Sequence, residues 1–351
     1  MGVKDKGHAG VKWYSAAKRE RGMMRSGICA AAIAMAVMGA LGLAYPWPLS
    51  AQGPGSANPS AKAQTTGAAV PGASKTQVVI LGTGTPAANP DASGPAVAIV
   101  VNGAAYLVDC GPGVVRRAAA AERKGIAALK VQNIKTVFIT HLHSDHTLGY
   151  PDLIFSPWVL GRTEPLEVYG PRGLQSMTEH LEKAWEKDID VRTNGLGQVN
   201  KTGYQVHVHE IEPGVVYQDK NVTVRAFLVP HGSWDQAFGY RFETSDRTIV
   251  LSGDTGPTDA IAKACHGCDV LLHEVYGEAT VATQTPDRQK YFHAYHTSTG
   301  ELAKEAAEAK PGLLVLYHQM YWSPATDAQL LDEVKQHYAG KVVSARDLDV
   351  Y

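Results

Sequence analysis

The sequence predicts an α/β sandwich. Three observations lead to this expectation. Short apolar segments alternate with segments of helical spacing after residue 76, the alternation occurs in two successive halves, and metal-binding residue types follow several of the apolar segments. The chain has 351 residues, of which 44% are hydrophobic and 19% charged, so it can bury a substantial core.

Residues 1–51 have the pattern of a basic leader followed by a signal peptide. Residues 1–25 carry seven basic and two acidic side chains, and residues 26–51 carry neither. The apolar segment Ile28–Ala44 is followed by the small residues Ser50 and Ala51. We expect export, to the periplasm or outside the cell. An uncleaved anchor is the alternative, since the apolar segment approaches the ~20 residues of a spanning helix, and it would be the chain's only contact with a membrane.

The remaining chain divides into a linker and a domain. Residues 52–75 are rich in Gly, Ala, Pro and Ser and predict a flexible linker, and residues 76–351 predict one folded domain. The part after position 51 carries 26 basic and 32 acidic residues, a net charge of about -6. A basic surface for nucleic acid is missing from this balance, so we expect nucleic acid not to be a partner.

The first half of the domain contains mainly strands. An Asn-Gly pair at 102–103 predicts a hairpin between two of them. The expected strands are Gln77–Leu81, Ala96–Val101, Ala105–Val108 and Thr136–Thr140, and a helix is expected over Leu174–Lys187.

The second half starts with two alternating segments that predict antiparallel strands, Tyr204–Ile211 and Val222–Val229. Ser298 and Glu301 form a capping box that opens a helix extending to Ala309. The other expected strands are Tyr240–Glu243, Thr248–Ser252, Val270–His273 and Leu313–Tyr317, and the other expected helices are Ala260–Cys265 and Asp327–Tyr338.

The segment His141–His146 (HLHSDH) places three imidazoles and one carboxylate directly after an apolar strand. Such a group would be costly to desolvate in a core, but on a loop its members can converge on one point. Imidazole nitrogen and carboxylate oxygen are ligands that zinc takes. We expect His141 and His143 to face one metal centre, and Asp145 and His146 to face a second.

With this segment, the chain resembles the metallo-β-lactamase superfamily and, within it, the ribonuclease Z-like branch. The resemblance covers Thr76–Tyr351 and implies a four-layer αβ/βα sandwich of the metallo-β-lactamase type. The motifs that match in family order are LGTGTP (Leu81–Pro86), LVDCGPGVVR (Leu107–Arg116), HLHSDH, VPHG (Val229–Gly232), SGDT (Ser252–Thr255) and LVLYH (Leu314–His318).

The resemblance implies two zinc ions, with manganese or mixed metals left open. The implied metal ligands are His141, His143 and His231 for one ion, Asp145, His146 and His318 for the other, and Asp254 for both. Asp109 is implied to be the buried carboxylate that orients a ligand histidine. Two metal ions that share one water lower its pKa toward ~7, and the resulting hydroxide would attack an ester.

The catalytic residues implied by the resemblance are Asp145, Glu274 and His296. Glu274 lies in LLHEVYGEAT and His296 in FHAYHTST, two segments that support protonation of the leaving group in the branch. The first segment departs from the family pattern, because Val275 and Tyr276 stand where the branch has Ala and Thr. Five aromatic residues could line a pocket near the ligand segments: Trp158, Trp234, Tyr240, Tyr317 and Trp322.

For the substrate, the sequence favours a small ester over RNA. Acidic residues dominate Tyr150–Gly203, no Gly/Arg-rich arm is visible there, and export would separate the enzyme from tRNA. We therefore expect an arylsulfatase-like or phosphodiesterase-like exported member that cleaves a small-molecule sulfate ester, phosphodiester or lactone.

Other interpretations remain open at this point. The first alternative is a ribonuclease Z-type endonuclease that processes the 3′ end of tRNA. The second is a non-catalytic metal-binding protein, which the retention of all seven ligands argues against. A homodimer is left open, and so is the choice between a disulfide and two thiols at Cys265 and Cys268.

Overall fold

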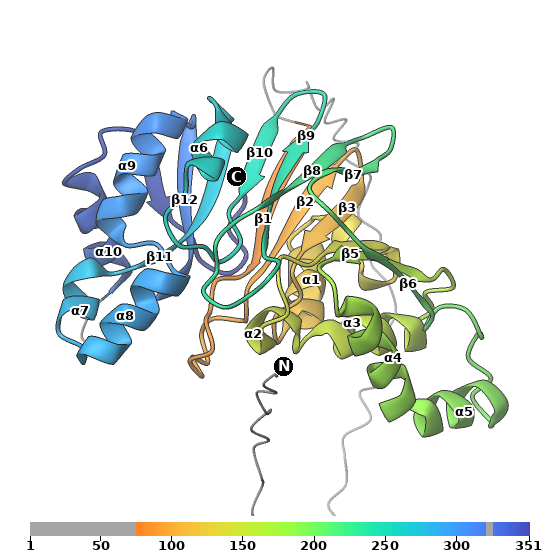
Figure 1. Ribbon diagram of the computed structural model, residues 1–351. Helices are drawn as coiled ribbons and strands as arrows, with labels where there is room; N and C mark the ends of the chain where they lie inside the picture. Colours follow the sequence, from red (N-terminus) through yellow and green to blue (C-terminus); the bar gives the residue numbers. More distant parts are fainter. Residues whose placement is uncertain (1–74, 321–325) are drawn as a thin grey trace, which may run out of the picture. The chain divides into compact units, whose positions relative to one another are not determined.

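The computed structural model describes residues 75–320 and 326–351, which form two mixed β-sheets and the helices that pack on them (Figure 1). The expected leader and signal (residues 1–51), all but the last residue of the expected linker and Trp322 lie outside the described residues. Within the described ranges, no helix is long and apolar enough to cross a membrane.

The first sheet has six strands in the order β1-β2-β3-β4-β5-β6. Neighbours from β1 to β3 are antiparallel, and those from β3 to β6 are parallel. Its strands are β1 (Thr76–Gly82), β2 (Ala96–Val101), β3 (Ala104–Val108), β4 (Thr136–Phe138), β5 (Leu166–Gly170) and β6 (Val206–Glu210).

The second sheet has seven strands in the order β13-β12-β11-β10-β9-β8-β7. Neighbours from β7 to β10 are antiparallel, and those from β10 to β13 are parallel. Its strands are β7 (Gly214–Gln218), β8 (Thr223–Leu228), β9 (Phe238–Glu243), β10 (Thr248–Leu251), β11 (Val270–Tyr276), β12 (Leu313–Met320) and β13 (Val342–Ser344).

The helices fall into two sets by their place in the chain. Those between the strands of the first sheet are α1 (Val114–Arg123), α2 (Ser144–Thr147), α3 (Tyr150–Val159), α4 (Leu174–Ala184) and α5 (Glu186–Asn194), with 3₁₀ turns at Ala127–Leu129 and Val131–Asn133. The others are α6 (Asp259–Cys265), α7 (Glu278–Ala282), α8 (Pro286–Tyr295), α9 (Thr299–Ala309) and α10 (Asp327–Lys335).

Three apolar clusters separate four layers. Successive side chains of a strand point to opposite faces, and in β1 Val79 and Leu81 pack with α1 and α3, whereas Val78 and Ile80 pack between the two sheets. A third cluster joins the far face of the second sheet to α6, α9 and α10. The order helix, sheet, sheet, helix confirms the predicted sandwich.

The structure corrects several expected elements. The helix expected over Leu174–Lys187 is two helices, α4 and α5. Of the two segments expected to be antiparallel strands, Val222–Val229 is confirmed, because β8 pairs antiparallel with β7 and β9. The expectation was wrong for Tyr204–Ile211, because β6 pairs in parallel with β5. Alternation reports which face of a strand is buried, and it carries no information about the pairing partner.

The hairpin at Asn102–Gly103 and the capping box of α9 are confirmed. Cys265 and Cys268 form a disulfide at the end of α6. Three strands, β5, β7 and β13, and five helices, α1, α2, α3, α7 and α8, were not anticipated. The start of α8 carries a readable signal, because Thr285 caps the helix and Pro286 occupies its first turn.

Candidate metal centre

The predicted ligands meet where strands of both sheets end. In the first sheet, His141 lies three residues after the end of β4, and Asp109, which contacts the ligand His146, directly follows β3. In the second sheet, His231 follows β8 and Asp254 follows β10; these strands run in the same direction because both are antiparallel to β9. His318 lies near the end of β12. One edge of the sandwich therefore collects side chains that are up to 209 residues apart in the chain.

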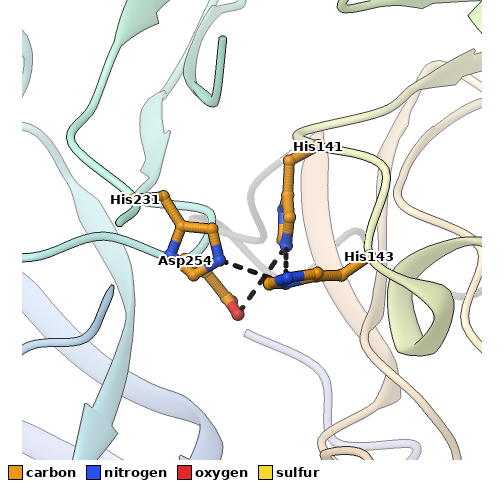
Figure 2. A group of neighbouring side chains, drawn as sticks. All are labelled: His141, His143, His231 and Asp254. Carbon is orange, nitrogen blue, oxygen red and sulfur yellow. Dashed lines mark hydrogen bonds and ion pairs between the residues drawn. The ribbon is translucent and has the colours of Figure 1, made fainter. Parts of the chain in front are cut away.

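The first ligand group consists of His141, His143, His231 and Asp254 (Figure 2). Nδ1 of His143 lies 2.9 Å from Nε2 of His141 and 3.1 Å from Nε2 of His231. Oδ2 of Asp254 lies 3.9 Å from Nε2 of His141. One potential ligand atom of each residue thus converges on a common point.

The second ligand group consists of Asp145, His146 and His318, all buried. Nε2 of His318 lies 3.2 Å from Oδ2 of Asp145. Asp254 joins the two groups, because its Oδ1 is 3.3 Å from Nε2 of His146 while its Oδ2 faces His141. The structure therefore brings all seven predicted ligands together in the predicted grouping.

Oxygen acceptors behind the ligands orient several of the rings. Nδ1–H of His146 donates to Oδ2 of Asp109 at 2.8 Å, and Nδ1 of His231 lies 2.7 Å from the carbonyl oxygen of Tyr295. Nδ1 of His141 lies 3.0 Å from Oγ1 of Thr140, which in turn donates to Asp109. A proton on the outer nitrogen leaves the Nε2 lone pair of each ring for a metal.

His143 has a different outer contact. Its Nδ1 faces the other ligands, and its Nε2 accepts a hydrogen bond of 2.9 Å from the indole N–H of Trp234. A neutral ring that accepts at Nε2 carries its proton on Nδ1. This contact therefore fits the metal-free imidazole, and metal binding at Nδ1 requires it to rearrange.

The loop after β3 and the loop of the HLHSDH segment are in close contact. A Cβ added to Gly111 would lie 2.5 Å from the carbonyl oxygen of Asp145, so a side chain there would push the loops apart. The amide of Cys110 donates to the carbonyl of His146 at 2.9 Å. These contacts hold Asp109 in reach of His146.

Two site residues adopt backbone conformations that sequence patterns do not reveal. Asp109 has φ 59° and His318 has φ 46°, in the left-handed region that L-residues seldom enter. Such residues cost about 1–3 kcal/mol each and tend to cluster at functional sites. The backbone at these positions turns the side chains out of the regular strand alternation.

Burial and carboxylates act in opposite directions on the histidines. Burial, reinforced by His146, lowers the pKa of His141 well below its usual value, and burial lowers the pKa of His231 to about 4. At His146, burial also favours the neutral ring, but Asp254 and Asp109 outweigh it and raise the pKa. Asp254 and Asp109 therefore stabilise a positive charge at this centre.

The donor set fits metal ions. Among the described residues, Nε2 of His146 and Oδ1 of Asp254 are buried atoms without a hydrogen-bond partner, an arrangement that is costly unless another group satisfies them. Burial would raise the pKa of Asp254, but His318 and His146 outweigh it and hold the pKa well below its usual range. Ionised carboxylates and neutral imidazoles are the forms that bind metals.

A cavity of about 450 Å³ adjoins the two groups. It is lined by ligands of both groups, by the loop after β1 and by residues of α8. His296 lines the cavity, and its Nδ1 lies 3.4 Å from Oε1 of Glu274. Glu274 is fully buried, does not line the cavity, and accepts hydrogen bonds from the amides of Thr255 and Thr297.

The structure describes four of the five aromatic residues expected near the pocket. Of these four, only Trp234 hydrogen-bonds a metal-ligand side chain, that of His143. Trp158, Tyr240 and Tyr317 are buried in the apolar clusters. Arg288 and Tyr291 line the cavity from α8 and were not expected from the sequence. Their three-residue spacing would have placed them on one helix face, had α8 been anticipated.

Solved structures share this architecture. The metallo-beta-lactamase fold protein YhfI from Bacillus subtilis superimposes with a TM-score of 0.60 and 20% identity, covering 79% of this chain and 99% of that one. The short form of human tRNase Z superimposes with a TM-score of 0.58 and 24% identity, covering 78% and 98%. These similarities show that the chain has the metallo-β-lactamase fold.

Sequence comparisons place the chain more narrowly. The family model described as a beta-lactamase superfamily domain matches residues 105–319. A ribonuclease Z of Mycobacterium bovis (strain BCG / Pasteur 1173P2) is 32% identical over 276 residues, which cover 78% of this chain and 96% of the relative. A ribonuclease Z of Mycobacterium sp. (strain KMS) is 34% identical, covering 73% and 87%. The chain therefore belongs to the metallo-β-lactamase superfamily, in its ribonuclease Z-like branch.

These relatives correct two expectations, the small-molecule ester as substrate and the exclusion of nucleic acid as a partner. Both were wrong, because the relatives that match nearly end to end are ribonucleases. The net charge of the domain was a poor guide, since it averages over the whole surface. The acidic residues between positions 164 and 190 that suggested a small substrate are absent from the cavity lining.

Proposed function

We propose that this chain is a ribonuclease Z-type phosphodiesterase that cleaves the 3′ extension of precursor tRNA. The observation that carries this proposal is the match to ribonuclease Z relatives over 96% of their length. It is supported by the convergence of seven metal-ligand side chains beside an open cavity.

We propose zinc as the metal, held by His141, His143 and His231 on one side and by Asp145, His146 and His318 on the other. Asp254 contacts both groups and would bridge them. Nitrogen-rich sets with one or two carboxylates suit zinc, although manganese binds similar ligands. Two bound ions would supply an activated water and would neutralise the charge that develops on the phosphate.

Asp145 and His296 would accept and donate the protons of the reaction. Both side chains line the cavity, so both are accessible to a bound phosphodiester. Asp145 can accept a proton from the attacking water, and the ring of His296 can donate one to the leaving oxygen of the ribose.

Glu274 would act through His296. Its Oε1 is fixed by two backbone amides and lies 3.4 Å from Nδ1 of His296, so it orients that ring and leaves Nε2 for the substrate. Because Glu274 does not line the cavity, we assign it as a positioning residue.

The test is cleavage of a 3′-extended precursor tRNA by the metal-loaded protein. We expect endonucleolytic cleavage that is abolished in Asp254→Asn. In His296→Gln, kcat should fall by about 10²–10⁴ while metal content and KM stay unchanged. His207→Gln is the matched control, since His207 is exposed and hydrogen-bonds Glu167 on the surface of the first sheet. RNA left intact by protein that holds two metal ions would contradict the proposal.

A further inference from the structure

One wall of the cavity is a face of α8. Arg288, Tyr291 and Phe292 line the cavity from this helix, and His296 follows its last residue. Residues three or four apart share a helix face, so Arg288, Tyr291 and Tyr295 form a row along α8. The row starts beside His296 and extends away from the metal ligands.

Tyr291 and Tyr295 form a stack of two rings. Their centroids are 4.5 Å apart, and their planes are inclined by 19°. Tyr291 nevertheless exposes 41% of its surface, whereas Phe292 next to it is buried and supplies the core contact of the helix. Tyr291 thus presents an aromatic surface to the cavity that packing of the helix does not require.

The ring of Tyr295, which supports Tyr291 in this stack, is held in place. The hydroxyl of Tyr295 accepts from the amide of Ser233 at 3.2 Å and donates to its Oγ at 3.1 Å. The ring lies against Gly232, where an added Cβ would approach within 2.0 Å of Tyr295. Because Tyr295 is fixed, it is a firm support for Tyr291.

Arg288 brings a positive charge to the same wall. Its guanidinium carbon lies 5.4 Å from the ring centroid of Phe292. Among the described residues that line the cavity, Arg288 is the one arginine or lysine. A guanidinium binds a phosphate with paired N–H donors. The carboxylates at the metal centre, by contrast, repel a phosphate in the absence of metal.

We propose that Arg288 and Tyr291 form a nucleotide-binding subsite, in which Tyr291 stacks on an RNA base next to the scissile phosphodiester and Arg288 binds a neighbouring phosphate. This inference rests on the function proposed above and names the part of the RNA that the cavity recognises. Stacking accepts any base, because every base has a π-face, so the subsite selects unpaired nucleotides rather than a sequence.

The size of the effect follows from the chemistry. Loss of an aromatic ring that stacks on a base lowers affinity by about tenfold to a hundredfold. Loss of one phosphate contact to single-stranded RNA lowers the slope of log affinity against log salt by about 0.7. The two side chains therefore give separable signatures.

The first experiment measures kcat and KM of the metal-loaded full chain on 3′-extended precursor tRNA. Tyr291→Ala should raise KM by about tenfold to a hundredfold, and Tyr291→Phe, which keeps the ring, should restore it. Arg288→Gln should raise KM and weaken its salt dependence. Trp185→Ala is the control for an exposed aromatic residue, since Trp185 is 39% exposed and is absent from the cavity lining.

The second experiment replaces single nucleotides by abasic ribose on either side of the cleavage site. If Tyr291 stacks on one of these bases, removing that base should raise KM for the unsubstituted protein and have little further effect on Tyr291→Ala. At the nucleotide on the other side, the two penalties should multiply. This coupling distinguishes a stacking contact from a general disturbance of the site.

The outcomes separate the subsite from the function. Cleavage of RNA with equal KM for the unsubstituted protein and Tyr291→Ala would overturn the subsite and leave the proposed function standing. If base removal and Tyr291→Ala raise KM by factors that multiply at both flanking nucleotides, the stacking contact is also overturned. No cleavage by the unsubstituted, metal-loaded protein would overturn the proposed function and the subsite together.

Discussion

The carboxylate of Asp109 receives the Nδ1–H of His146 at 2.8 Å, and the opposite nitrogen of the same ring faces Asp254 at 3.3 Å. The side chains of Asp109 and His146 are both buried. One hydrogen bond thus sets the tautomer and the direction of a ring that is expected to bind metal.

Substitution Asp109→Asn tests this relationship. Asparagine tolerates the left-handed backbone of this position and keeps an oxygen for the amide of Thr140, so the fold should persist. It lacks the second acceptor for His146. We expect metal affinity at the Asp145, His146 and His318 group to fall by about 10–100-fold, measured by competition with a chelator. Unchanged affinity, equal to that of the exposed control Asp91→Asn, would remove Asp109 from this role.

Metal binding should alter the environment of Trp234. A metal at Nδ1 of His143 requires the proton on Nε2, and the indole N–H then loses its acceptor. Titration of metal-free protein should change the tryptophan fluorescence, and Trp234→Phe should remove that change. Trp185→Phe is the control and should retain it. A full change in Trp234→Phe would show that the signal arises elsewhere.

Gly232 should be sensitive to any side chain. It has φ 53°, and an added Cβ would lie 2.0 Å from the ring of Tyr295, whose carbonyl lies against His231. We expect Gly232→Ala to lower the free energy of unfolding by about 2–4 kcal/mol and to weaken metal binding. Gly103→Ala has a positive φ but no atom within 4 Å, and should cost ~1 kcal/mol with metal binding intact. Equal losses in both variants would refute the packing explanation.

The buried pair His273 and Glu305 should make stability depend on pH. Burial favours neutral His273, but Glu305, 3.3 Å away, outweighs it and raises the pKa. The folded chain therefore binds the proton more tightly than the unfolded chain, so the stabilisation is complete below pH ~6.5 and is lost as pH rises through the folded pKa. Urea unfolding should show a loss of up to about 1.4 kcal/mol per pH unit in that window. The slope should be smaller in Glu305→Gln, and the part that remains would come from His146, whose pKa is also raised. A slope unchanged by this substitution would remove the His273–Glu305 pair as a cause.

The fold and the ligand set could be predicted from the sequence because both have local signals. Strand alternation marks buried faces, and HLHSDH gathers four ligands in six residues. His231, Asp254 and His318 are isolated, and the motifs of a known family were needed to connect them with the first four.

Other parts of the site lack such signals. The pairing of β6 with β5 depends on contacts between distant segments. The positive φ of His318 occurs where the register between β12 and β11 shifts. Arg288 and Tyr291 are exposed residues of a helix with no amphipathic pattern, so only their position beside the ligands indicates a role. The substrate was misjudged for a similar reason, since net charge says nothing about where charges lie.

The most direct test of a two-metal ribonuclease is precursor tRNA cleavage measured while metal-free protein is reconstituted with increasing equivalents of zinc. We expect cleavage to rise with added metal and to saturate at about two ions per chain. Saturation at one ion per chain, or RNA that stays intact with both groups filled, would contradict it.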